Sequence, residues 1–205
     1  IPTQPGTLAI PTTSTLKIGG LNTSAQTFNG KISNAQIFNA VLSGPEVETL
    51  YNYGSPIQTL ANIPQSSNLK AWYKLDATEI YNSTSTEWSV DNNKYPSAYP
   101  SSLSFVPNDY INCGSPSSLD FERTDAFSIS AWVKRVGSGS YQSIVYKANN
   151  NSPYNGYAFY IDNNNKVGFN ITIDYTSNNY FGKVCTSVLN TDWNNVLITY
   201  NGNSN

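Results

Sequence analysis

The sequence predicts an all-β fold, an antiparallel two-sheet jelly-roll sandwich with one short helix. Short apolar or alternating runs recur along the 205 residues, and clusters of Asn, Gly, Ser and Pro separate them. Short apolar runs separated by clusters of turn residues are typical of the strands and turns of a sandwich. Aromatic residues form 13% of the chain, including 15 Tyr, and this content excludes a simple disordered tail. The chain is long enough to bury a real core.

The expected strands follow one another with turn clusters between them. We predict them at residues 15–20, 31–38, 69–75, 102–106, 109–113, 127–135, 142–148, 156–162, 166–174, 180–185 and 195–200. Asn163, Asn164 and Asn165 separate two of these strands. Because Asn tolerates the left-handed backbone of tight turns, 156–162 and 166–174 are expected to form a hairpin.

The segment 127–135 indicates which side of a strand faces the core. Successive residues of a strand point to opposite faces of its sheet. The apolar set, expected to lie between the two sheets, is Phe127, Ile129, Ala131 and Val133. The set on the opposite face is Ser128, Ser130, Trp132 and Lys134.

One short helix is expected near residues 43–52. Ser43 is a typical N-cap, and Glu46 follows it three residues later, which together form a capping box. Pro45 suits the first turn of a helix.

The order of two segments bears on domain organisation. Leu16 to Gly54 has the pattern of the end of a β-domain, whereas Asn68 to Asp76 has the pattern of a beginning. The chain is therefore either a window across two consecutive copies of one module or one module in permuted order. The absence of Met and the strand and turn at 196–205 favour the window. The expected parts are the C-terminal part of one sandwich at 1–57, a linker at 58–67, and the N-terminal part of a second sandwich at 68–205.

These motifs resemble those of the concanavalin A-like lectin/glucanase superfamily, and within it the laminin G-like modules. The closing pattern of those modules stands at Ile18, Gly19, Gly20, Phe28, Gly30, Ile32, Ile37, Phe38, Leu42, Ser43, Glu46, Leu50 and Tyr51. The opening pattern and the strand after it stand at Ala71 to Asp76, Tyr110 to Gly114, Phe127 to Lys134, Trp193, Val196, Thr199, Tyr200 and Gly202. Here the closing pattern comes first, which departs from the family order. The resemblance implies two packed antiparallel sheets and, commonly, glycan or protein binding.

Aromatic and amide side chains in the predicted loops are candidates for glycan contact. Aromatic rings can stack on the apolar faces of sugars, Asn side chains can hydrogen-bond sugar hydroxyls, and function concentrates on loops. The candidates are Tyr141, Asn149, Tyr154, Asn155, Tyr175, Asn178 and Tyr180. The alternative is that the tyrosines fill strand faces and the asparagines form ordinary turns.

Catalysis is not expected of this chain. Glycoside hydrolases use a pair of carboxylates, and the retaining glucanases of this fold carry E-x-D-x-x-E on one strand, a run that is missing from the sequence. The nearest pairs are Asp120 with Glu122 and Glu46 with Glu48. The chain has no His, which excludes a Ser-His-Asp triad and imidazole ligands to a metal.

Calcium is a candidate cofactor, because related modules often bind it through oxygen ligands at a loop rim. The candidate ligands are Asp76, Asp91, Asp162 and Asp174. The run 162–166 lacks the Gly and the distal Glu of an EF-hand loop, which favours a simple hairpin turn there.

Cys113 and Cys185 have no metal-ligand spacing, and we expect two buried free thiols, with a disulfide between them as the alternative.

Three hypotheses for function follow. The first is a non-catalytic lectin-like module of a larger virion surface or extracellular protein, such as a phage fibre or decoration protein with tandem copies that bind a cell-surface glycan. The second is a structural spacer that contacts other virion proteins in a multimeric assembly, and the third is a glucanase-like hydrolase.

A net charge of −2 argues against nucleic acid as a partner. No apolar run approaches the roughly 20 residues that cross a bilayer, so membrane insertion is not expected.

Overall fold

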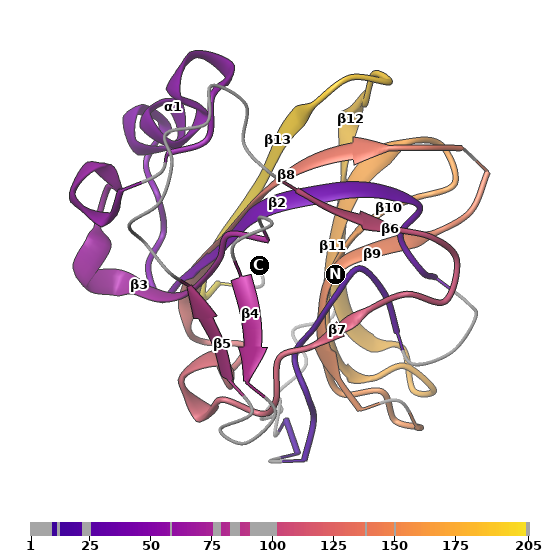
Figure 1. Ribbon diagram of the computed structural model, residues 1–205. Coiled ribbons are helices and arrows are strands. Elements are labelled where there is room, and N and C mark those ends of the chain that lie inside the picture. The colour runs from indigo at the N-terminus through magenta and orange to yellow at the C-terminus, as the bar shows by residue number, and fades with distance from the viewer. Residues whose placement is uncertain are drawn as a thin grey trace.

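The computed structural model describes residues 10–11, 13–21, 26–57, 59–75, 79–82, 87–90, 102–137, 139–149 and 151–203. Two antiparallel sheets lie face to face, and the short helix lies outside one of them (Figure 1). The all-β sandwich expected from the sequence is therefore confirmed. Among the described residues, no helix has both the length and the apolar character to cross a membrane.

The larger sheet, named sheet A here, has the strand order β12-β11-β10-β9-β1-β7. Its strands are β1 (Lys17–Ile18), β7 (Ile111–Asn112), β9 (Gln142–Ala148), β10 (Gly156–Ile161), β11 (Lys166–Asp174) and β12 (Asn179–Val188). The expected hairpin is confirmed as β10 and β11, which pair antiparallel from Gly156 opposite Thr172 to Ile161 opposite Val167.

The second sheet, named sheet B, has the order β13-β8-β2-β3, and β6 also pairs with β2. Its strands are β2 (Gly30–Phe38), β3 (Leu69–Tyr73), β6 (Leu103–Phe105), β8 (Ala126–Arg135) and β13 (Asn194–Asn201). A small separate sheet, which the strand pattern did not predict, pairs β4 (Glu79–Asn82) with β5 (Glu87–Val90). The helical elements are α1 (Gly44–Tyr51) and the 3-10 turns η1 (Asn52–Gly54), η2 (Leu60–Asn62), η3 (Ser66–Asn68) and η4 (Ser117–Leu119).

The main core lies between the two sheets, and β8 enters it in the expected register. Its apolar set belongs to this core, with relative exposures of 1% for Phe127 and 0% for Ile129, Ala131 and Val133. Phe127 contacts the rings of Phe121, Phe169 and Tyr200 at centroid distances of 4.6, 5.6 and 5.4 Å. These separations are typical of favourable aromatic pairs.

The outward face of β8 is buried as well, because α1 and its flanking turns cover sheet B. Ser128 donates its hydroxyl to the carbonyl of Ala40 at 2.7 Å and accepts the Leu42 N–H at 3.0 Å. Trp132 stacks on Tyr51 of α1 with ring centroids 5.8 Å apart. A second apolar cluster forms beneath the helix from Phe38, Leu42, Leu50, Ile57 and Ile63. Alternation alone predicts the two faces of β8 but not the cover on the outer one.

The helix begins as its capping box predicts. The Glu46 carboxylate accepts the Ser43 N–H and the Ser43 hydroxyl, each at 2.7 Å, and the Gln65 amide at 2.9 Å. These hydrogen bonds, that from the Ser43 backbone first, hold the pKa of Glu46 below its ordinary value. The residue after the helix, Asn52, adopts a left-handed conformation with φ of 41°.

The pairing places both parts of the chain in one sandwich in this structure. The sequence favours separate sandwiches for 1–57 and 68–205, but β2 pairs with β8, β3 and β6, and β1 pairs with β7 and β9. Residues from both parts fill the same core. This arrangement is that of the permuted alternative. Whether further copies flank this sandwich in a longer polypeptide stays a prediction.

The segment expected as a linker, 58–67, is ordered where it is described. It contains η2 and runs into η3, and Ile63 packs into the cluster beneath α1. Asn68 donates its N–H to Gln65 and accepts that of Asn39, so the segment is tied to the end of β2. It acts in this structure as a connection within one sandwich.

No disulfide links the two cysteines, as expected, but the expected burial of both thiols is wrong. Cys185 is exposed and Cys113 is half-buried. Cys185 lies on β12, the end strand of sheet A, whose side chains are largely exposed because no described strand pairs with its other edge. A strand pattern read from the sequence does not distinguish an edge strand from a central one.

Candidate functional site

The outward side of sheet A carries a group of tyrosines that the fold brings together. In β10, Tyr157, Phe159 and Ile161 face the core, so Ala158 and Tyr160 face outward. In β12, Phe181 packs against the core, so Tyr180 also faces outward. We name this surface the tyrosine face and define it by Tyr141, Tyr154, Tyr160, Tyr175 and Tyr180.

Three of the predicted glycan contacts form a continuous aromatic cluster at one end of this face. Tyr154 meets Tyr175 edge to face at 6.4 Å, and Tyr175 stacks on Tyr180 at 5.5 Å with the ring planes 27° apart. The Tyr175 N–H donates to the carbonyl of Pro153 at 3.1 Å, which ties the β11–β12 turn to the loop before β10. The rings remain accessible, with relative exposures of 43% for Tyr154, 58% for Tyr175 and 49% for Tyr180.

A second aromatic pair lies toward the other end of the same strands. Tyr141 precedes β9 and contacts Tyr160 of β10 with ring centroids 5.7 Å apart. The Tyr160 ring crosses Gly168 of β11 so closely that a Cβ at Gly168 would lie 2.4 Å from a ring carbon. Gly168 therefore allows the ring to lie along the sheet. Burial, then the neighbouring Tyr141, Asp162 and Tyr180, raise the pKa of Tyr160, which stays a neutral hydrogen-bond donor at neutral pH.

Small and amide side chains occupy the surface between the two aromatic groups. The strand register aligns Ala158, Asn170 and Gly182 in one row across β10, β11 and β12. Asn170 is half-buried and Gly182 is exposed. A low surface with an amide near its centre and aromatic rings at both ends matches the chemistry of a sugar, which has apolar ring faces and hydroxyl edges.

The asparagine candidates lie beside the aromatic cluster and also shape its loops. Asn149 donates its N–H to the carbonyl of Asn155 at 2.9 Å, and its side-chain oxygen accepts the Asn151 N–H at 3.1 Å. Asn178 adopts a left-handed conformation with φ of 57° in the turn before β12. Turn formation explains Asn149 and Asn178, so the tyrosines are the stronger candidates for ligand contact.

The candidate calcium ligands are not gathered in one place. Asp162 accepts the N–H groups of Asn164 and Lys166, each at 2.8 Å, and Asp174 accepts the N–H and hydroxyl of Thr176 at 2.9 and 2.6 Å. The two aspartates flank opposite ends of β11, roughly 25 Å apart at the rise of an extended strand. Asp76 and Asp91 lie outside the described residues. Within the described part of the chain, no group of acidic or cysteine side chains is arranged to hold a metal ion.

Two of the carboxylates weighed for catalysis, those of Asp120 and Glu46, have structural partners. Asp120 pairs with the buried ammonium of Lys147 at 2.8 Å, and Lys147 also donates to the carbonyl of Ser14 at 2.8 Å. Glu46 caps α1, which covers sheet B, whereas Asp120 follows η4 and pairs with a lysine of sheet A. The Glu122 N–H donates to Asp125 in a turn before β8.

Sequence reasoning missed two tyrosines of the outer face, Tyr160 and Tyr146. Burial, then Tyr154, raise the pKa of Tyr146 to about 12, and Lys17 lies 5.9 Å from the Tyr146 ring centroid. The alternation of 156–162 carried the signal for Tyr160, because Ala158 and Tyr160 must face away from Tyr157 and Phe159. Which of these two faces is solvent-accessible depends on the sheet order, which the pattern does not contain.

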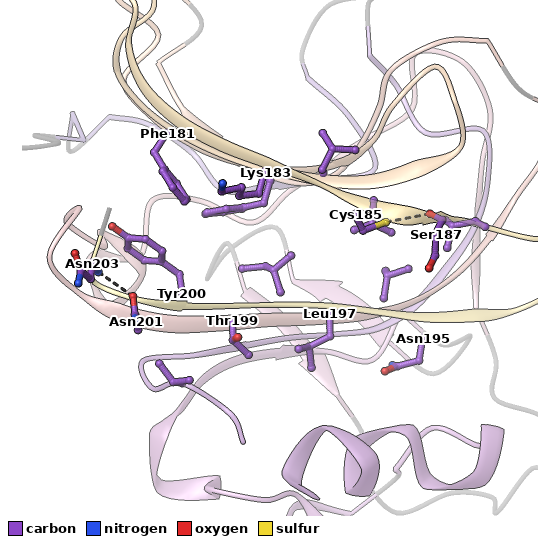
Figure 2. Close-up of a pocket in the computed structure, with 18 residues that line it drawn as sticks. Phe181, Lys183, Cys185, Ser187, Asn195, Leu197, Thr199, Tyr200, Asn201 and Asn203 are labelled. Atoms are coloured by element: carbon purple, nitrogen blue, oxygen red, sulfur yellow. Dashed lines mark hydrogen bonds between the residues drawn. The ribbon is translucent and has the colours of Figure 1, made fainter. Parts of the chain in front are cut away.

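A hollow of about 710 Å³ lies away from the tyrosine face, between the end strands of the two sheets. Its walls come from β12 and β13, with contributions from β11 (Figure 2). None of the residues predicted to bind a ligand or a metal lines it.

Residues 106–205 match a laminin G family model described as the concanavalin A-like lectin/glucanases superfamily. The comparisons with curated proteins and with solved structures gave no match. The matched region runs from the turn before β7 to the end of the chain and supplies strands to both sheets. Laminin G-like domains are typically binding modules, which supports a lectin-like binding role in general terms. The two antiparallel sheets packed face to face are consistent with a concanavalin A-like jelly-roll sandwich, and residues 106–205 are similar to laminin G-like modules.

Proposed function

We propose that this protein is a non-catalytic lectin-like module that binds a neutral glycan on the tyrosine face. The observation that carries the proposal is the accessible cluster of Tyr154, Tyr175 and Tyr180, which joins two separate loops. Exposed apolar side chains that lie singly need no explanation, but a contiguous exposed group marks an interaction site. Aromatic rings present a large apolar area with little conformational entropy to lose on binding.

The polarity of this face supports an uncharged ligand. Its donors and acceptors are phenols and amides, including Asn170 between the aromatic groups. Lys17 lies on the same side of sheet A but is only 4% exposed and contacts Tyr110 and Tyr146. Asp174 already accepts two hydrogen bonds from Thr176. A sugar that needed a strong ionic partner would find few charged groups here.

The engaged carboxylates support the non-catalytic part of the proposal. A glycosidase needs two carboxyl groups placed on either side of one glycosidic bond. Asp120 pairs with Lys147, Glu46 caps the helix, and neither lies on the tyrosine face.

The proposed setting is a virion surface or extracellular protein, in which cell-surface glycans and other virion proteins are the partners. The scarcity of charge and the polar, Asn- and Tyr-rich composition support this setting.

A glycan array followed by titration of any bound sugar tests the proposal. Tyr175→Ala and Tyr180→Ala are each expected to weaken binding about tenfold or more, because each removes a stacking surface. Tyr53→Ala is the matched control, since Tyr53 is 97% exposed but lies in η1, directly after helix α1 and away from the tyrosine face. Its affinity should equal that of the unaltered protein. Repeating the titration with a calcium chelator tests the calcium prediction in the same experiment.

Two results would contradict this assignment. If the folded protein binds no glycan on the array, the spacer function becomes the better account. If the protein hydrolyses a polysaccharide and Asp120→Asn or Glu122→Gln abolishes the cleavage, the module is an enzyme.

A further inference from the structure

The two aromatic groups of the tyrosine face are separated along the strands. Tyr160 of β10 lies opposite Gly168 of β11, whereas Tyr180 of β12 lies opposite Thr172 of β11. Gly168 and Thr172 are four residues apart on β11, which is about 13 Å at the rise of an extended strand. Tyr175 lies further along, in the turn after β11. One sugar ring is similar in size to one tyrosine ring, so a single sugar can stack on one group but not on both.

The surface between the two groups is low. Its middle row consists of Ala158, Asn170 and Gly182, which the strand register places side by side. The Tyr160 ring does not stand up as a wall, because its outer carbons and its hydroxyl lie directly over Gly168 of β11. A ligand that contacts both aromatic groups must therefore lie along the sheet.

The side chain of Asn170 is an uncommitted polar group in the middle of this surface. It is half-buried, and it forms no hydrogen bond with another residue in the described part of the chain. The Asn149 side chain, by contrast, accepts the Asn151 N–H at 3.1 Å. An amide offers both a donor and an acceptor, and a sugar hydroxyl can satisfy either one. A partly desolvated amide gains from such a partner, because burial has removed some of its water.

We propose that the tyrosine face binds a linear, neutral, β-1,4-linked glycan along its length. One sugar stacks on Tyr175 and Tyr180, another stacks on Tyr141 and Tyr160, and the Asn170 amide hydrogen-bonds a hydroxyl between them. This inference rests on the proposed function, since it names the ligand class of the same surface. It makes Asn170 a residue that determines specificity.

The linkage follows from the shape of the surface. In a β-1,4-linked chain of glucose-type sugars the linkages are equatorial, so the rings form an extended ribbon with apolar faces. Such a ribbon can present one face to both aromatic groups. In an α-1,4-linked chain the same sugars curve into a helix and leave the surface between the groups. A chain that is extended before binding also loses less conformational entropy when it binds.

The probes are cello-, xylo- and chito-oligosaccharides, which are three neutral β-1,4-linked series. Isothermal titration calorimetry compares the disaccharide and the hexasaccharide of each series. In at least one series the hexasaccharide should bind more than about tenfold more tightly, because overlapping binding positions alone account for only about fivefold. Maltohexaose, the α-1,4-linked counterpart of cellohexaose, should gain no more than this fivefold over maltose.

Variants at the second aromatic group and at the central amide make the test specific. Tyr141→Ala should reduce the ratio of hexasaccharide to disaccharide affinity to about fivefold, whereas Tyr141→Phe should keep the higher ratio because it retains the ring. Asn170→Ala should weaken hexasaccharide binding about fivefold, as the loss of one hydrogen bond predicts. Tyr53→Ala is the control and should leave the ratio unchanged. Circular dichroism of each variant checks that it is folded.

The outcomes separate this inference from the proposed function. If a glycan on the array binds to the tyrosine face but no β-1,4-linked series gains affinity with length, the proposed function stands and the extended ligand is wrong. An equal gain for maltohexaose, or an unchanged ratio in folded Tyr141→Ala, would also overturn the extended ligand. If no glycan binds in either experiment, the proposed function fails and this inference fails with it.

Discussion

Lys147 has charged and polar partners that only the complete fold brings together. Its side chain is fully buried on β9, yet it carries an ammonium that reaches Asp120 and the carbonyl of Ser14, each at 2.8 Å. These partners belong to segments far apart in the sequence. A buried charge is tolerated only when its partners are in place. The strand pattern at 142–148 predicted a strand but gave no sign that this lysine would face inward, because long cationic side chains are almost always exposed.

Removal of one partner of this pair should destabilise the sandwich. Lys147→Ala is expected to lower the free energy of unfolding by about 3 kcal/mol, since it leaves Asp120 without its counter-charge and opens a cavity. Breaking a buried ion pair in this way costs about 3 to 5 kcal/mol, and the low end of that range applies because the Asp120 side chain is 26% exposed. Lys147→Met combined with Asp120→Asn should be less destabilised than Lys147→Ala. Urea denaturation followed by circular dichroism measures both, and equal stability of Lys147→Ala and the unaltered protein would contradict the assigned role.

Helix α1 shows what can and cannot be inferred for a single element. The capping box at Ser43 and Glu46 predicted its start, because a capping box is defined by neighbours three residues apart. Its function as the cover of sheet B was not predictable, since it depends on contacts such as Tyr51 with Trp132 that are distant in sequence. The same distinction applies to the tyrosine face. Local composition selected Tyr154, Tyr175 and Tyr180, whereas only the register of β10, β11 and β12 joins them with Tyr160.

The depressed pKa of Glu46 predicts a pH dependence for this helix. The folded pKa lies below the ordinary value of 4.5, so the ionised form stabilises the folded state. This contribution is fully present above the unfolded pKa and is lost as the pH falls through the folded pKa. The stability difference between the unaltered protein and Glu46→Gln should therefore be constant near neutral pH and shrink below about pH 4.5. Urea titrations of both proteins at several pH values provide the measurement, and a difference that grows on acidification would refute it.

The whole molecule depends on strands supplied by both parts of the chain. Strand β1 lies between β9 and β7, and β2 lies between β8 and β3, so the first part inserts into the interior of both sheets. The sequence identified these segments as the end and the beginning of a module. It could not show which segments pair. Hydrogen bonding between strands leaves no local sequence pattern, and each possible order of the strands in a sheet is compatible with the same alternation of apolar and polar residues.

Cleavage of the connection between the two parts tests whether they form one unit. A protease recognition sequence inserted within residues 59–62, which are exposed in this structure, allows the chain to be cut after folding. Because β1 and β2 bury Leu16, Ile18, Ile32 and Ile37 in the common core, the two fragments should elute together in size-exclusion chromatography. They should separate only when denaturant is added, and the cut protein should retain its circular dichroism spectrum. Fragments that separate in native buffer while each keeps a folded spectrum would restore the expectation of two independent sandwiches.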